Sequence, residues 1–431
     1  MKIEDNKKVI KENKIQVSNV KQQITKKEVN HIANILKLLV HENINMKNLA
    51  KIVFLVIVLT NMNLFSQKSQ RDLDNYRNPD KRGINVFEAP KDTVLAPFKD
   101  VYVRMGGASA LQFQSLSHSN SGVVPLKEIG GNFNLATANL DIDVVLGKGL
   151  RMHLRTYLSS RHHPEPYVKG GYIQIDNLDF IKESFMENFM KYATVKIGHM
   201  ENNYGDAHFR RSDNAQALFN PFVGNLIMDA FTTEVGAELY YRKNGFISMV
   251  GISNGKLNQD VANPDTGGAS FLAKFGYDKQ INDDFRFRLT GSLYNTGRVR
   301  TSYLYSADRA GSRYYLVLEP DTATPSANFR SGRYNPNLSN QIRAFMINPF
   351  VRYKGWEFFG TYENATGKNA AETDNRTATQ WALESIYRFG KDENLYIGAR
   401  YNTVNSEERN GDNIEISRFN LSGGWFLTKN M

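Results

Sequence analysis

The chain has 431 residues, of which 41% are hydrophobic and 12% aromatic, and its formal net charge is +10. It contains no cysteine, which excludes disulfide frameworks, thiolate metal sites and cysteine nucleophiles. Residues 1–66 hold eleven lysines and five acidic residues, so the rest of the chain carries only about +4. The basic balance is therefore no argument for a nucleic-acid partner, and we expect none.

The N-terminal part has the pattern of an export signal. Met46–Lys51 is a short basic start, and Ile52–Leu59 is an unbroken apolar run, too short to span a bilayer as a helix. Leu64–Ser66 provides a cleavage site that ends on a small residue. We therefore predict a signal peptide over residues 46–66.

Three further regions follow from this assignment. Residues 1–45 are polar and basic, and we interpret them as an upstream extension from a mis-assigned start codon; the alternative is a cytoplasmic tail with a signal anchor. Residues 67–99 are polar and rich in turn residues, which predicts an extended periplasmic lead-in. Residues 100–431 form the remaining domain.

Residues 100–431 show repeated alternation of apolar and polar residues. In Leu150–Ser160, the apolar Leu150 and Leu154 alternate with Arg151 and Arg155. Successive side chains of a strand point to opposite faces, so this spacing separates charged from apolar residues. The same signal, clear or weak, predicts strands at Val101–Leu116, Asn132–Val145, Leu150–Ser160, Gly170–Leu178, Tyr192–His199, Phe231–Arg242, Phe246–Ser253, Phe271–Gln280, Phe285–Tyr294, Ile342–Tyr353, Trp356–Tyr362, Thr379–Phe389, Leu395–Thr403 and Ile414–Leu427.

The connections between these segments alternate in length. Tight turns such as Asn244-Gly245, a favoured hairpin pair, alternate with long polar connections. Phe180–Lys191 breaks the pattern and predicts a short helix on the short side. The long connections are Ser117–Gly131, Ser160–Lys169, Met200–Met228, Asn254–Gly268, Asn295–Asn340, Ala365–Asn375 and Val404–Asn413.

Strands and connections together predict an all-β fold. We expect a closed transmembrane antiparallel up-and-down β-barrel of about 14 strands in a membrane protein, with both termini periplasmic and the long loops outside. The alternative is a soluble β-sandwich, whose strands also alternate, although a sandwich explains neither the loop lengths nor the signal peptide.

Four parts of the chain resemble porins of Gram-negative outer membranes, in particular the porin-like proteins of Bacteroidetes-type bacteria. They are the signal end Phe65-Ser66-Gln67, the opening strand Val101–Phe113, the stretch His199–Asp229 and the aromatic strand Phe419–Phe426. The resemblance implies an outer-membrane location, insertion by the barrel-assembly machinery, contact with outer-membrane lipid and a homo-oligomer. One departure is that five residues follow Trp425-Phe426, where such barrels usually end on an aromatic residue.

The resemblance also implies a constriction, because the third long loop of porins folds into the lumen. Here that loop is Met200–Met228, which also carries apolar residues. The alternative is an exposed loop or a latch on a neighbouring subunit. The candidate constriction residues are Asn202, Asn203, Tyr204, Asp206, His208, Arg210, Arg211 and Asp213.

The polar faces of the predicted strands supply candidate lumen-lining residues. A slight excess of basic residues among them predicts at most a mild preference for anions. The alternative is that opposite charges pair across neighbouring strands and fill the wall. The candidates are Arg104, Asp141, Asp143, Arg151, His153, Arg155, Lys196, Glu234, Glu238, Arg286, Arg288, Arg352, Glu384, Arg388 and Arg400.

Signals for catalysis and cofactors are weak. The chain has no GxSxG, HExxH or phosphate-binding loop, and the adjacent His162 and His163 lack a third ligand. We therefore expect no enzyme, no metal and no cofactor. The predicted function is passive diffusion of small hydrophilic solutes or ions. The alternatives are an accessory or scaffold barrel with a plugged lumen, and, more remotely, an enzyme or an adhesin.

Overall fold

The computed structural model describes residues 73–91, 95–159, 163–256, 267–307 and 314–431. The predicted extension over residues 1–45, the signal peptide over residues 46–66 and the first part of the lead-in lie outside these ranges. The chain divides into residues 1–71 and residues 72–431, and only the second unit is described.

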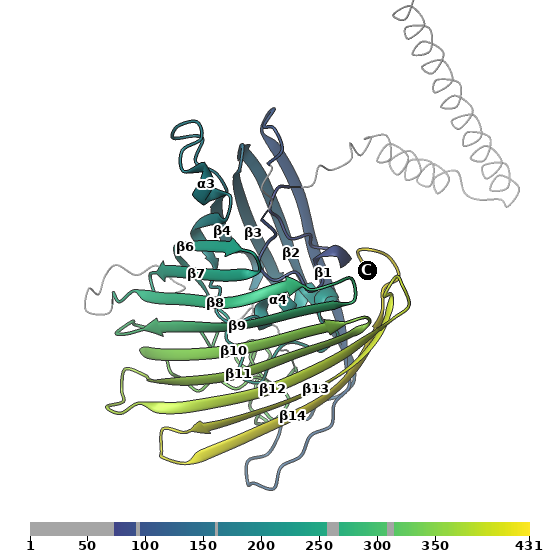
Figure 1. The fold of residues 1–431 in the computed structure, drawn as a ribbon. Coiled ribbons are helices and arrows are strands. Elements are labelled where there is room, and N and C mark those ends of the chain that lie inside the picture. The colour runs from purple at the N-terminus through teal and green to yellow at the C-terminus, as the bar shows by residue number, and fades with distance from the viewer. Residues whose placement is uncertain (1–72, 92–94, 160–162, 257–266, 308–313) are drawn as a thin grey trace, which may run out of the picture. The chain divides into compact units, whose positions relative to one another are not determined.

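The described residues form one antiparallel sheet of fourteen strands, ordered as in the sequence (Figure 1). Every predicted strand is present, so the all-β up-and-down fold is confirmed. The strands are β1 Tyr102–Gln114, β2 Asn132–Gly147, β3 Leu150–Ser159, β4 His163–Ile175, β5 Ala193–Glu201, β6 Thr233–Lys243, β7 Phe246–Ser253, β8 Ser270–Gln280, β9 Phe285–Thr296, β10 Gln341–Tyr353, β11 Trp356–Lys368, β12 Arg376–Phe389, β13 Leu395–Glu407 and β14 Asn413–Trp425.

The two edge strands are not paired with each other. Within the described ranges, β1 pairs only with β2 and β14 only with β13, so the predicted closure of the barrel is not seen. Both edge strands instead form hydrogen bonds with the long connection between β9 and β10. Gln114 of β1 bonds to the backbone of Tyr315, and Asn420 of β14 bonds to the hydroxyl of Tyr314 at 3.2 Å.

Three connections predicted to be long are short, because their strands extend further than the alternation suggests. β4 begins at His163, β11 continues to Lys368 and β13 continues to Glu407. The predicted helix Phe180–Lys191 is reduced to α3, Glu187–Met190, after a turn region with positive φ at two residues. No helix in the described ranges is long and apolar enough to cross a membrane.

The exposure of the two faces of the sheet is the reverse of that in a soluble protein, because apolar side chains are exposed and charged side chains are buried. On β12, the side chain of Leu383 is 62% exposed, whereas the adjacent Glu384 is 1% exposed. The same contrast holds between Leu289 and Arg288 on β9. Charged residues therefore occupy the inner face and apolar residues the outer face, as in a membrane barrel. A soluble sandwich would need a second sheet over the apolar face, and all fourteen strands belong to one sheet.

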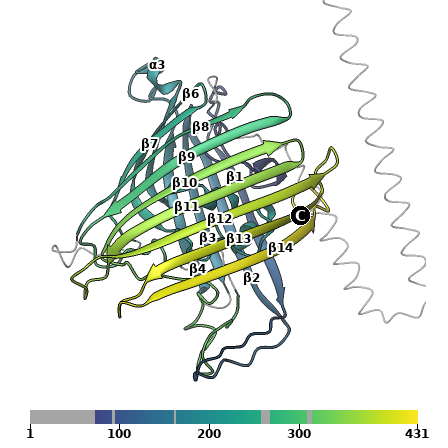
Figure 2. The same cartoon turned by 60° about the horizontal axis from the view of Figure 1, so that its bottom comes forward.

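Segments outside the strands fill much of the inner side of this curved sheet (Figures 1 and 2). The first is residues 73–91, which include η1, Lys81–Gly83. The second is the connection 202–232, with α4, Ala207–Arg210, and η2, Asn214–Phe219. The third is part of the connection 297–340, whose Leu304 and Tyr305 are buried.

Apolar packing closes the interior along β10–β13. Phe87 of the lead-in lies 5.2 Å from Phe350 between ring centres, in a cluster that includes Phe359. Phe222 of the connection 202–232 packs in a second cluster with Ile386. The interior is therefore tightly filled around Phe350 and Phe359, whereas a cavity of about 230 Å³ remains beside Phe222 and Tyr396 of β13.

Candidate functional site

A buried group of four charges joins the interior segments to the wall. Lys274 of β8 and Arg288 of β9 face Asp206 of the connection 202–232, at 2.9 and 2.8 Å. Glu88 of the lead-in lies 2.7 Å from Arg288 and 3.5 Å from Lys274. We call these four residues the Asp206 cluster.

The two carboxyl groups of the Asp206 cluster are held ionised. Burial by itself raises the pKa of Asp206 and of Glu88. The adjacent Arg288 and Lys274 outweigh this effect and hold the pKa of both carboxyls below the usual range. The cluster is therefore a balanced set of two positive and two negative charges that fixes both segments in place.

A second buried network connects the same connection to β11–β13. Arg210 of α4 lies 3.1 Å from Glu384, which also binds Arg400 at 2.6 Å. Arg388 binds Glu357 at 2.6 Å. The guanidinium of Arg210 is thus directed into the wall rather than into open space.

All eight candidate constriction residues are buried inside the sheet. Arg211 donates a hydrogen bond to the carbonyl of Phe222 at 2.8 Å, and Asp213 pairs with Lys169 of β4. Tyr204 donates to Glu363 of β11 at 3.1 Å. The connection is therefore folded inward, and its polar side chains hold it to the wall.

The candidate lumen-lining residues lie on the inner face, and many are paired across neighbouring strands. Arg104 binds Asp143 at 2.9 Å, and the two stand opposite each other in the register of β1 and β2. Asp141 stands opposite Arg155 in the same way, with a hydrogen bond of 3.2 Å. Eleven of the fifteen candidates are buried. The other four are partly buried, and they are Arg155, Lys196, Arg286 and Arg352.

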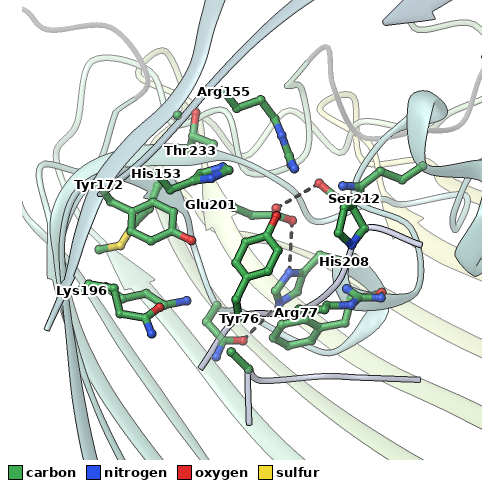
Figure 3. A pocket seen from close by; sticks show the side chains of 18 of the residues that line it. Tyr76, Arg77, His153, Arg155, Tyr172, Lys196, Glu201, His208, Ser212 and Thr233 are labelled. Atoms are coloured by element: carbon green, nitrogen blue, oxygen red, sulfur yellow. Dashed lines mark hydrogen bonds and ion pairs between the residues drawn. The ribbon is translucent and has the colours of Figure 1, made fainter. Parts of the chain in front are cut away.

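Open space remains on the opposite side of the interior, between the filling segments and β3–β6. Part of this space is a cavity of about 190 Å³ (Figure 3). Tyr76 and Arg77 come from the lead-in, Lys196 from β5, and His208 from α4. We call this space the inner cavity.

A second cavity opens beside the short turns, and a small third space shares lining residues with both cavities. The second cavity measures about 510 Å³ and is lined by residues 86–91, the β6–β7 turn, Asp278 and Arg286. This third space holds only about 20 Å³, between Phe209, Tyr240 and Arg242. Ala89 borders all three spaces.

Sequence patterns missed part of this arrangement. Glu88 and Phe87 lie in a segment without periodicity, and nothing in the sequence indicates that it enters the sheet. Lys274 alternates with the outward Phe271 and Phe275, so the strand pattern could have identified it as an inner residue. No group of three histidine or acidic residues within the described ranges could hold a metal ion. His162 lies outside those ranges.

Comparisons with known proteins give structural likenesses only. No protein-family model and no curated protein matches the chain. An anion-selective porin from Comamonas acidovorans aligns with 77% of this chain and 86% of its own, at 11% identity and a TM-score of 0.47. The trimer form of OmpT, an outer-membrane protein of Vibrio cholerae, aligns over 77% and 85%, at 10% identity and a TM-score of 0.42. The outer-membrane channel DcaP of Acinetobacter baumannii aligns over 77% and 99%, at 11% identity and a TM-score of 0.36.

Proposed function

We propose that this protein is an outer-membrane porin of a Gram-negative, Bacteroidetes-type bacterium, inserted by the barrel-assembly machinery. It provides passive diffusion for small hydrophilic solutes or ions. The observation that supports this most strongly is the reversed burial of the sheet, in which Leu383 is exposed and Glu384 is buried. An apolar outer face suits lipid, and a charged inner face suits a water-filled lumen.

The solute route follows β3–β9 rather than the centre of the lumen. Along β10–β12 the interior is filled, whereas the inner cavity and the cavity at the short turns lie next to each other on the other side. The narrowest point lies between Ala89 of the lead-in and Phe209 of α4. In this proposal Arg210 and Arg211 act on the constriction indirectly, because they anchor the connection that carries Phe209.

A second candidate function is a scaffold or accessory barrel with a closed lumen. The tight apolar packing around Phe87 and Phe222 supports it, because these residues fill the space that a wide pore leaves open. The two functions differ in one respect that can be measured: only the porin passes ions.

Single-channel recording of the purified full chain in planar bilayers distinguishes the two. A porin gives stepwise conductance that rises with salt, and a folded barrel without steps supports the scaffold. In the porin, Ala89→Trp should fill the narrow space of about 20 Å³ and lower the conductance severalfold. The matched control is Ala371→Trp, on the exposed β11–β12 connection, which should leave the steps unchanged. Equal conductance of the two variants would place the route elsewhere.

A further inference from the structure

The walls of the inner cavity carry far more positive than negative side chains. Five cationic residues line it, and Glu201 is its single carboxylate. That carboxylate is already engaged, because Ser212 donates to it at 3.0 Å and His208 lies 3.1 Å from it (Figure 3). The cationic residues are Arg77, Arg151, Arg155, Lys169 and Lys196.

Three of these cations lie near carboxylates that do not themselves line the cavity. Arg155 binds Asp141, and Lys169 binds Asp213. Arg151 lies 3.6 Å from Asp143. These pairs leave the positive charge of the cavity only partly balanced.

Asp143 is a weak partner for Arg151, because other bases share it. Arg104 binds its carboxylate at 2.9 Å and His153 at 2.8 Å. Arg151 is 5% exposed, and its Nε and one terminal nitrogen have no hydrogen-bond acceptor. Unsatisfied buried donors of this kind are costly unless a ligand or water meets them.

The two remaining cations form no ion pair with a carboxylate in the described part of the chain. Arg77 donates to the carbonyl oxygens of Gly83 and Phe209, at 2.9 and 2.6 Å. Burial away from water lowers the pKa of this guanidinium to about 9, although the negative charge of Glu201 acts to raise it. The ammonium group of Lys196 lies 5.3 Å from the ring centre of Tyr172.

Seven aromatic residues also line the cavity. Such rings suit the flat or apolar part of an organic molecule, and they also stabilise nearby cations. The volume of about 190 Å³ is below the roughly 300–1,000 Å³ of sites for drug-sized ligands, which limits the occupant to a small solute. The aromatic residues are Tyr76, Phe87, Tyr172, Phe209, Phe219, Phe231 and Tyr240.

We propose that the inner cavity is a binding site for a small organic carboxylate. Its charged group lies against Arg77, Arg151 and Lys196, and its organic part lies among the aromatic rings. The inference deepens the proposed function, since it names the class of solute for which the porin route is built. Binding itself does not require conduction, so the two proposals can fail separately.

The test measures binding of radiolabelled benzoate to the purified full chain in detergent micelles by equilibrium dialysis. Neutral benzamide has the same shape and should bind at least about tenfold more weakly, since a charge-assisted hydrogen bond contributes on the order of one to two factors of ten. Lys196→Gln and Arg77→Gln should each weaken benzoate binding about tenfold. Lys196→Arg keeps the charge and should retain most of the binding.

The control is Lys368→Gln, which removes the same charge from β11, a strand that contributes nothing to the inner cavity. Folding of each variant is checked by heat-modifiable migration. Equal binding of benzoate and benzamide, or equal loss in Lys368→Gln and Lys196→Gln, would overturn the site. Inorganic phosphate that competes as well as benzoate would overturn the organic class. Conductance steps in bilayers without benzoate binding would refute the carboxylate site alone. Benzoate binding without conductance steps would refute only the porin function.

Discussion

Asp206→Asn should destabilise the protein strongly, because Asp206 is the acceptor at the centre of the Asp206 cluster. Its carboxylate accepts hydrogen bonds from Lys274 at 2.9 Å, from Arg288 at 2.8 and 2.9 Å, and from Thr290 at 2.7 Å. The substitution keeps the size of the side chain but removes its charge. It also turns one acceptor into a donor that faces two buried cations, which are then left with Glu88 as their one carboxylate in the cluster.

The expected loss is about 3–5 kcal/mol, the usual effect of removing one partner from a buried ion pair. Adding the separate hydrogen bonds would give more, but bonds within one network are not additive. The measurement is urea unfolding of the protein folded into lipid vesicles, followed by the fluorescence of Trp356, Trp381 and Trp425. Asp374→Asn, in the exposed β11–β12 connection, is the control and should change stability by less than about 0.5 kcal/mol.

The effect of Asp206→Asn should depend on pH with a defined sign. The pKa of Asp206 is lowered in the folded protein, so its contribution is present above the unfolded value of about 3.9. That contribution is lost as the pH falls through the lower folded value, and the two proteins should converge in acid. Equal unfolding free energies for Asp206→Asn and Asp374→Asn at pH 7 would refute the anchoring role of the cluster.

Three further predictions follow from other parts of the structure. Leu383→Arg places a charge on the outer face and should lower the free energy of unfolding in lipid vesicles by about 2–4 kcal/mol. The control Lys391→Arg, in a short turn, should leave it unchanged. Equal stability of the two variants would mean that the outer face does not contact lipid. Burial raises the pKa of Asp229 to about 7, so ionisation between about pH 4 and 7 opposes folding, and Asp229→Asn should stabilise the protein at pH 8 but not at pH 4. Proteinase K added to intact cells should cut within residues 115–131, where Val123 is 99% exposed, and cleavage confined to Lys354-Gly355 would invert the topology.

Strand positions could be predicted because one signal, the alternation of side chains, determines them. The ends of β4, β11 and β13 could not, since polar residues there occupy both faces while the backbone pairing continues. Thr366 and Thr377, for example, still stand opposite each other in the register of β11 and β12. Backbone hydrogen bonds do not depend on polarity, so a polarity pattern ends before the strand does.

The site was less accessible to prediction. Arg155 and Lys196 could be placed on the inner face from alternation alone. Alternation does not predict which charged residues pair with the interior segments. Glu88 and Arg288, for example, are 200 residues apart and meet only in the folded sheet. The inner cavity depends on the lead-in, a segment whose composition resembles that of an ordinary linker.

The position of the lead-in has a consequence for the order of assembly. Asn85 bonds to Glu357 across 272 residues, and Lys81 bonds to Asn394 across 313 residues. The first described segment of the chain therefore finds its partners on strands near the C-terminus. Contacts between residues so distant in sequence form slowly, although the entropy of closing such large loops grows only slowly with their length. We expect docking of the lead-in to be the slowest refolding step, and a chain without residues 73–91 to lack that phase.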